Sequence, residues 1–216
     1  MLANHQLHLA QKWPRARVHG ILRNRNPVEL AQFIEERHSE RFFRPIRALG
    51  KALGNEQGYG FAMLALCSLL IETIQCYREG LPTTDRREFR GLMSLQKVPQ
   101  DYRLEEQNWK SSKEVFRRFF HRYQRIFQEL PGVRFYKHVR CGLLHQGQTK
   151  RGWIIRCGGT TDWHKQKGEI IINRDGFLKA LDSCSEKYLT ELRQGKWTGK
   201  TCRHAAKKVW WLLRLR

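Results

Sequence analysis

The stretch that decides the fold runs from residue 61 to residue 79 and reads FAMLALCSLLIETIQCYRE. It is apolar on nearly every side and is followed by Gly80 and Pro82, which predicts a long helix in the middle of a helical bundle. Its most apolar part, residues 61–71, is too short to cross a bilayer, so we expect no transmembrane segment. Glu72 is the odd residue of this stretch. A buried carboxylate needs a partner, so we expect an ion pair with an arginine of a neighbouring helix, which serves either stability alone or chemistry.

Shorter helical patterns lie on both sides of this stretch. Helices are predicted after Pro27, at residues 46–53, after the capping box of Ser111 and Glu114, near residues 133–143, and at residues 174–192. Aromatic residues continue the pattern after the capping box as an apolar stripe up to Leu130, and the opposite face carries Arg118, Arg122 and Arg125. Two short strands flanking a glycine-rich loop predict a hairpin at residues 152–173. The fold class is therefore mainly α, a bundle of five or six helices with one small β-hairpin.

The two ends of the chain are basic. Residues 1–26 contain five cations and no acid, which favours a flexible arm. Residues 196–216 contain seven cations and no acid, and either form an amphipathic helix for RNA or a membrane surface, or remain an unstructured tail. Gly199 and the short length favour the tail. The helical domain is thus expected at residues 27–195.

The charge of the chain predicts a polyanionic partner. Forty-one Lys and Arg against 20 Asp and Glu give a formal net charge of +21 and a pI near 10.3. Nucleic acid is the first expectation and an anionic membrane the second, with a basic surface that has no partner as the alternative. The six cysteines are scattered and the first thirty residues lack a signal peptide, which together favour reduced thiols in a cytoplasmic protein.

The stretch that carries chemistry reads YKHVRCGLLHQ at residues 136–146. Arg140 stays charged and can fork two phosphate oxygens, and His145 can exchange protons near neutral pH. Together they offer a proton acceptor and a group that stabilises negative charge. On an ideal helix five residues rotate by about 500°, which leaves the two side chains about 140° apart. The helix must therefore loosen near Gly142, end at His145, or share each cleft with a second protomer.

This motif, together with residues 60–80 and 140–153, resembles the HEPN superfamily of all-α proteins, whose hallmark is Arg, four to six residues, then His. The likeness covers about residues 30–193. It implies a HEPN-like bundle and a metal-independent RNA endonuclease that acts as a homodimer and leaves 2′,3′-cyclic phosphate ends, with no cofactor. It also implies a toxin or phage-defence role and a protein antitoxin or regulator as a further partner.

The resemblance assigns catalysis to Arg140 and His145, with Glu72 and Cys141 in support. Most catalytic members have a polar residue where this chain has Cys141. RNA contacts are expected from the neighbouring polar residues and the basic helix face: Lys137, His138, Gln146, Lys150, Arg118, Arg122 and Arg125. The alternatives are a purely structural Glu72–Arg140 pair with His145 at a helix C-terminus, and a non-catalytic RNA-binding or regulatory protein. A DNA-binding regulator is disfavoured because no helix-turn-helix pattern is present.

Other chemistries fit the sequence poorly. Cys141 and His145 lie four apart and Cys157 and His164 seven apart, and the second spacing falls outside the usual windows for structural zinc. No P-loop, GxSxG or HExxH motif occurs, and no second acidic cluster accompanies Glu105 and Glu106. We therefore expect no metal.

Overall fold

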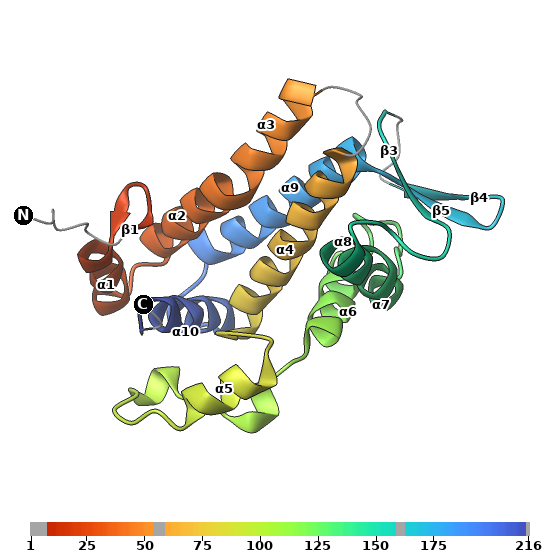
Figure 1. Ribbon diagram of the computed structural model, residues 1–216. Helices are drawn as coiled ribbons and strands as arrows, with labels where there is room; N and C mark the ends of the chain where they lie inside the picture. Colours follow the sequence, from red (N-terminus) through yellow and green to blue (C-terminus); the bar gives the residue numbers. More distant parts are fainter. Residues whose placement is uncertain (1–7, 54–58, 159–162, 215–216) are drawn as a thin grey trace, which may run out of the picture. The chain divides into compact units, whose positions relative to one another are not determined.

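The computed structural model describes residues 8–53, 59–158 and 163–214. Most of these residues are helical and two small sheets accompany them, so the predicted fold class of a mainly α protein with a small hairpin is confirmed (Figure 1). The chain divides into two compact units. The terminal unit comprises residues 1–41, 76–109 and 188–216, and the central unit comprises residues 42–75 and 110–187.

The terminal unit begins with a short hairpin and continues with helices from three parts of the chain. Asn26 caps the second helix by accepting hydrogen bonds from the backbone N–H groups of Val28 and Glu29, and Pro27 occupies its first position, as predicted. The end of α4 (Tyr59–Glu79) and the end of α9 (Arg174–Arg193) also belong to this unit. Its other elements are β1 (His8–Ala10), β2 (Trp13–Pro14), α1 (Arg15–Asn24), α2 (Pro27–His38), α5 (Arg86–Met93), the 3-10 turns η2 (Gln100–Tyr102) and η3 (Glu106–Asn108), and α10 (Lys200–Arg214).

The flexible arm expected at residues 1–26 and the unstructured tail favoured for residues 196–216 are both largely helical where the structure describes them, and a helix was the stated alternative for the tail. Helix α1 buries Val18, Ile21 and Leu22, and α10 buries apolar residues at the same spacing of three and four, ending at Leu213. Trp211 of α10 is fully buried, and its indole N–H donates to the carbonyl oxygen of Tyr102 at 3.1 Å. The basic composition hid this pattern, because the cations occupy the other side of each helix. Residues 1–7, 215 and 216 lie outside the described residues.

The central unit is built around aromatic side chains. It contains the last two residues of the π-turn η1 (Ser39–Phe43) and the whole of α3 (Arg44–Leu53) and α6 (Ser112–Arg122). It also contains the first part of α4 and most of α9. Ser111 caps α6 by accepting a hydrogen bond from the N–H of Glu114, as the capping box predicts. However, α6 ends at Arg122, before the end of the aromatic stripe, and Gln128 and Glu129 have positive φ angles that no helix accommodates. The last residues of the stripe are still buried, so a turn completes this core instead of a helix.

A three-stranded sheet follows the Arg/His motif. Its strands are β3 (Trp153–Arg156), β4 (Trp163–Gln166) and β5 (Glu169–Asn173), in the order β3-β5-β4. The hairpin is formed by β4 and β5, whereas β3 pairs with β5 in parallel. The two predicted strands are therefore parallel neighbours, and β4 occupies part of the expected loop. The last residue of β5, Asn173, caps α9 by accepting hydrogen bonds from the N–H groups of Asp175 and Gly176.

Helix α4 is the one described helix that is long and apolar enough to cross a bilayer, and half of its most apolar window is buried inside the protein. Polar side chains interrupt it: Ser68 and Gln75 are buried, and Glu72 is nearly so. The Ser68 hydroxyl donates to the carbonyl oxygen of Leu64 within the helix. This burial is typical of a core helix, which is the interpretation that the sequence favoured.

Candidate active site

The Arg/His motif lies on a helical segment with an unusual turn. The segment starts as α7 (Gly132–Phe135), widens to a π-helix in η4 (Tyr136–Arg140) and returns to α-helix in α8 (Cys141–Gln146). Helices with such π-turns often carry functional sites. The segment ends at Gly147, whose φ of 67° forms a left-handed cap.

Gly142 has a packing role within this segment. A Cβ atom at this position would lie 2.4 Å from the carbonyl oxygen of Gln148, so only glycine allows the following loop to fold back onto the helix. The loop is held there by the N–H of Lys150, which donates to the carbonyl oxygen of His138 at 2.9 Å. Gly142 therefore lets the residues after the helix pack against it, and α8 continues through Gly142 without a break.

Arg140 forms the ion pair that the sequence predicted. Its Nη2 lies 3.1 Å from Oε2 of Glu72 on α4, and the two side chains are only 17% and 13% exposed. The other carboxylate oxygen of Glu72 accepts a hydrogen bond of 2.6 Å from the hydroxyl of Ser112, the first residue of α6. Three helical segments thus fix the arginine. Its Nε is buried and has no hydrogen-bond partner among the residues that the structure describes.

Tyr136 packs beside this pair, and its ring centre lies 5.6 Å from the guanidinium carbon of Arg140. Burial raises the pKa of the Tyr136 hydroxyl, a hydrogen bond with Cys141 raises that pKa further, and the charge of Arg140 opposes both effects. Cys141, expected to support the catalytic pair, therefore interacts with Tyr136. The ring of Tyr136 thus covers one side of the guanidinium group of Arg140.

His145 is exposed and lies within a regular part of α8, one residue before the helix ends. Helix α8 runs through Gly142 and ends at Gln146, one residue after His145, whereas Arg140 is the last residue of the π-turn η4. The two side chains therefore come from different helical turns, and the angle of about 140° of an ideal α-helix does not describe them. In the described residues no hydrogen bond joins the two side chains. A shared cleft would need a second copy of the chain.

A cluster of cations surrounds His138, which is buried and packs beside the ring of Trp153. Burial lowers the pKa of His138, and four neighbouring cations lower it further: Arg151, Lys137, Arg134 and Lys150. In the described part of the chain none of these four forms an ion pair. We call these four residues the basic cluster. Lys137 and Lys150 were predicted from the sequence as RNA contacts, whereas Arg134 and Arg151 were not. Arg151 joins the cluster because the loop after α8 folds back onto the helix.

The other predicted RNA contacts are more scattered. Arg118 is bound to Glu114, which also binds Arg117, and these two hydrogen-bonded arginines, Arg117 first, lower the pKa of Glu114 to about 2. Arg122 is exposed at the end of α6, and Arg125 is exposed in the turn beyond it. The three arginines therefore do not share one helix face, which corrects the prediction. Gln146 is exposed at the end of α8.

In the ranges that the structure describes, no group of three or more His, Cys, Asp or Glu side chains is arranged to hold a metal ion. Comparison of the chain with protein-family models, with curated proteins and with solved structures finds no match. The likeness to HEPN proteins therefore depends on the residues quoted above.

Proposed function

We propose that the protein is a metal-independent endoribonuclease of HEPN type. The observation that carries this proposal is the arrangement of Arg140. It is held nearly buried by Glu72, one of its N–H donors lacks a partner among the described residues, and the same helical segment presents an exposed histidine. A fixed charge with an unmet donor is typical of functional sites, where such groups wait for a ligand.

In the proposed reaction the 2′-hydroxyl of one nucleotide attacks its own 3′-phosphate. His145 accepts the hydroxyl proton as the new bond from O2′ to phosphorus forms, and the bond from phosphorus to O5′ breaks. Arg140 stabilises the negative charge that builds on the non-bridging oxygens. The O5′ leaving group takes up a proton, and the products are a 2′,3′-cyclic phosphate and a 5′-hydroxyl.

The helix geometry makes a homodimer part of the proposal. Within one chain Arg140 ends η4 and His145 lies on α8, and no hydrogen bond joins the two side chains in the described residues. The proposed cleft therefore combines Arg140 of one protomer with His145 of another. The basic cluster would bind the phosphates on either side of the cleavage point. A toxin or phage-defence role in the cytoplasm, with a protein antitoxin or regulator, follows from the resemblance and belongs to the same proposal.

The test is incubation of the purified protein with labelled RNA in excess EDTA, beside the variants Arg140→Lys and His145→Ala. His164→Ala is the matched control, because His164 is also exposed but lies on β4. Cleavage to cyclic-phosphate ends, lost in both variants and kept in the control, would support the proposal. RNA binding without cleavage by the natural sequence would refute it.

Mixing the two inactive variants tests the shared cleft. In a mixed dimer one cleft combines the intact Arg140 of one protomer with the intact His145 of its partner, so random mixing restores about a quarter of the active clefts. Failure to restore cleavage, although the subunits exchange, would exclude a cleft built from one residue of each copy.

The second candidate is a non-catalytic RNA-binding protein. It is favoured by the engagement of the Arg140 charge with Glu72, and by the lack of a hydrogen bond between the side chains of Arg140 and His145 in the described residues. In that case both variants would keep RNA affinity with an unchanged salt dependence, and the natural sequence would not cleave.

A further inference from the structure

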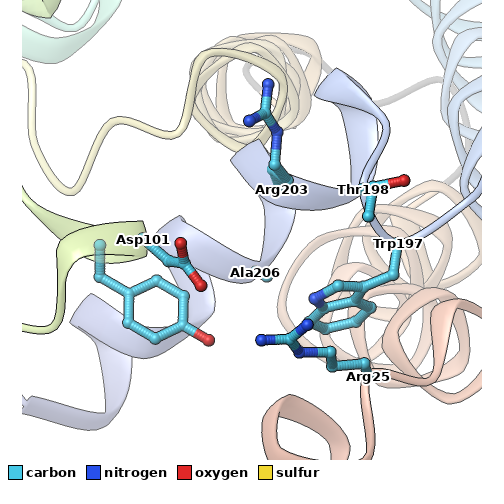
Figure 2. A pocket seen from close by; sticks show the side chains of 7 residues that line it. Arg25, Asp101, Trp197, Thr198, Arg203 and Ala206 are labelled. Carbon is cyan, nitrogen blue, oxygen red and sulfur yellow. The ribbon is translucent and has the colours of Figure 1, made fainter.

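The terminal unit contains a cavity of about 250 Å³ that the proposed reaction does not use. It lies where the end of α1 meets η2, the loop after α9 and the first turns of α10 (Figure 2). The residues that matter for its chemistry are Arg25, Asp101, Tyr102, Trp197 and Thr198. They come from three distant parts of the sequence, so only the fold brings them together.

Three charged residues line this cavity: Arg25, Asp101 and Arg203, and the guanidinium group of Arg203 points away from the other two (Figure 2). Arg25 and Asp101 extend into it from opposite sides (Figure 2), and neither forms an ion pair with another residue in the described ranges. Both act on Tyr102: burial raises the pKa of its hydroxyl, Asp101 raises that pKa further, and Arg25 lowers it. The cavity thus offers a cation and an anion that are not paired with each other. Such a cavity suits a ligand that carries both an acidic group and hydrogen-bond donors.

The walls of the cavity are aromatic and well fixed. The ring of Tyr102 stacks on Trp210 with centroids 5.3 Å apart, and its carbonyl oxygen accepts a hydrogen bond from the indole of Trp211. The indole of Trp197 is only partly covered, so its surface can accept a flat ring. Thr198 lies just before α10, a 15-residue helix whose positive dipole end favours an anion.

We propose that this cavity binds a nucleotide, with the base on Trp197, the N–H donors of the base on Asp101 and the phosphate on Arg25. A carboxylate only accepts hydrogen bonds, so guanine, which presents two adjacent N–H groups, suits Asp101 best. An amino acid would match the two charges but would leave the aromatic walls without a planar partner. A free nucleotide and a nucleotide within an RNA chain share this chemistry.

The test is titration calorimetry of the full chain with GMP, guanosine, inorganic phosphate and a short guanosine-containing RNA. Asn tolerates the left-handed backbone of Arg25, where φ is 53°, so Arg25→Asn removes the charge without new strain. GMP should bind, and Arg25→Asn should weaken GMP by about tenfold or more while changing guanosine little. Asp101→Asn should remove the preference for GMP over UMP. Arg23→Gln is the matched control, because Arg23 is exposed on α1 and does not line the cavity.

Two results would overturn the proposal: no binding of GMP at millimolar concentration, or equal GMP affinity in the natural sequence and in both cavity variants. If the short RNA displaces GMP, the cavity binds a nucleotide within an RNA chain. If only free nucleotides bind, the cavity is an effector site. The proposal shares no residue with the ribonuclease site. Arg140→Lys should therefore keep GMP affinity, so the two proposals can fail separately.

Discussion

The Glu72–Arg140 pair gives the sharpest test of the central unit. Glu72→Gln keeps the shape of the side chain and removes its charge. At 3.1 Å the gross attraction is about 5 kcal/mol for an effective dielectric constant of about 20. Desolvation of two nearly buried groups offsets most of this, so the net contribution should be about 1–3 kcal/mol. Arg140→Gln should cost at least as much, since it leaves the carboxylate nearly buried without its cation.

The two variants and their double mutant form a thermodynamic cycle, which urea unfolding followed by tryptophan fluorescence can measure. We expect the double mutant to be more stable than the sum of the single losses implies, by about 1–3 kcal/mol. In the cleavage assay Glu72→Gln should lower the rate and leave RNA affinity unchanged, because it mispositions Arg140 without removing it. A coupling energy below about 0.5 kcal/mol would refute the argument that Glu72 holds the arginine in place.

Three further changes probe other parts of the structure. Burial, and to a smaller extent a neighbouring arginine, lowers the pKa of His38 to about 3. Below about pH 6.5, the ordinary pKa of histidine, the unfolded chain therefore binds more protons than the folded chain. The contribution of His38 to stability is therefore complete above pH 6.5 and is lost as the pH falls, by up to about 1.4 kcal/mol per pH unit, and denaturant titrations of His38→Leu should show a weaker pH dependence. Gly142→Ala should destabilise the central unit by about 1–3 kcal/mol through the contact with the loop, whereas Gly91→Ala on the open side of α5 should be neutral or stabilising by about 0.5–1 kcal/mol in thermal unfolding. Trp211→Ala should cost about 3–5 kcal/mol, because the side chain is fully buried, and a smaller loss than in Trp210→Ala would contradict the packing of α10.

The sequence predicted those parts whose pattern is local. Helices α2, α4 and α9 were found from apolar spacing and capping residues, and the partner of Glu72 was inferred because a lone carboxylate in an apolar helix needs a cation. The prediction for the two ends of the chain relied on their basic composition and overlooked the spacing of their apolar residues. In α10 the buried positions follow a helical period, although residues 196–216 contain seven cations.

The site was predicted less completely, since its missing parts depend on long-range contacts. Arg151 joins the basic cluster only because Gly142 lets the loop return to the helix. The cavity of the terminal unit depends on Arg25 and Trp197, which lie in the segments expected to be an arm and a tail, and on Asp101, where no helix or strand was predicted. No local pattern links such residues.

The scarcity of acids explains how one basic chain can hold both fixed and available cations. With 41 cations and 20 acids, ion pairs cannot neutralise the surface, and the pairs that do form hold only particular arginines. Glu72 selects Arg140, and Glu114 selects Arg117 and Arg118. A phosphate chain must compete with these carboxylates, whereas it meets no such competitor among the described residues at the basic cluster. Neutralising a member of that cluster should therefore reduce the salt dependence of RNA binding by about 0.7 per phosphate contact, and Arg118→Gln should change it less. An equal effect at Arg118 would mean that RNA displaces Glu114, and that exposure alone decides which cations bind.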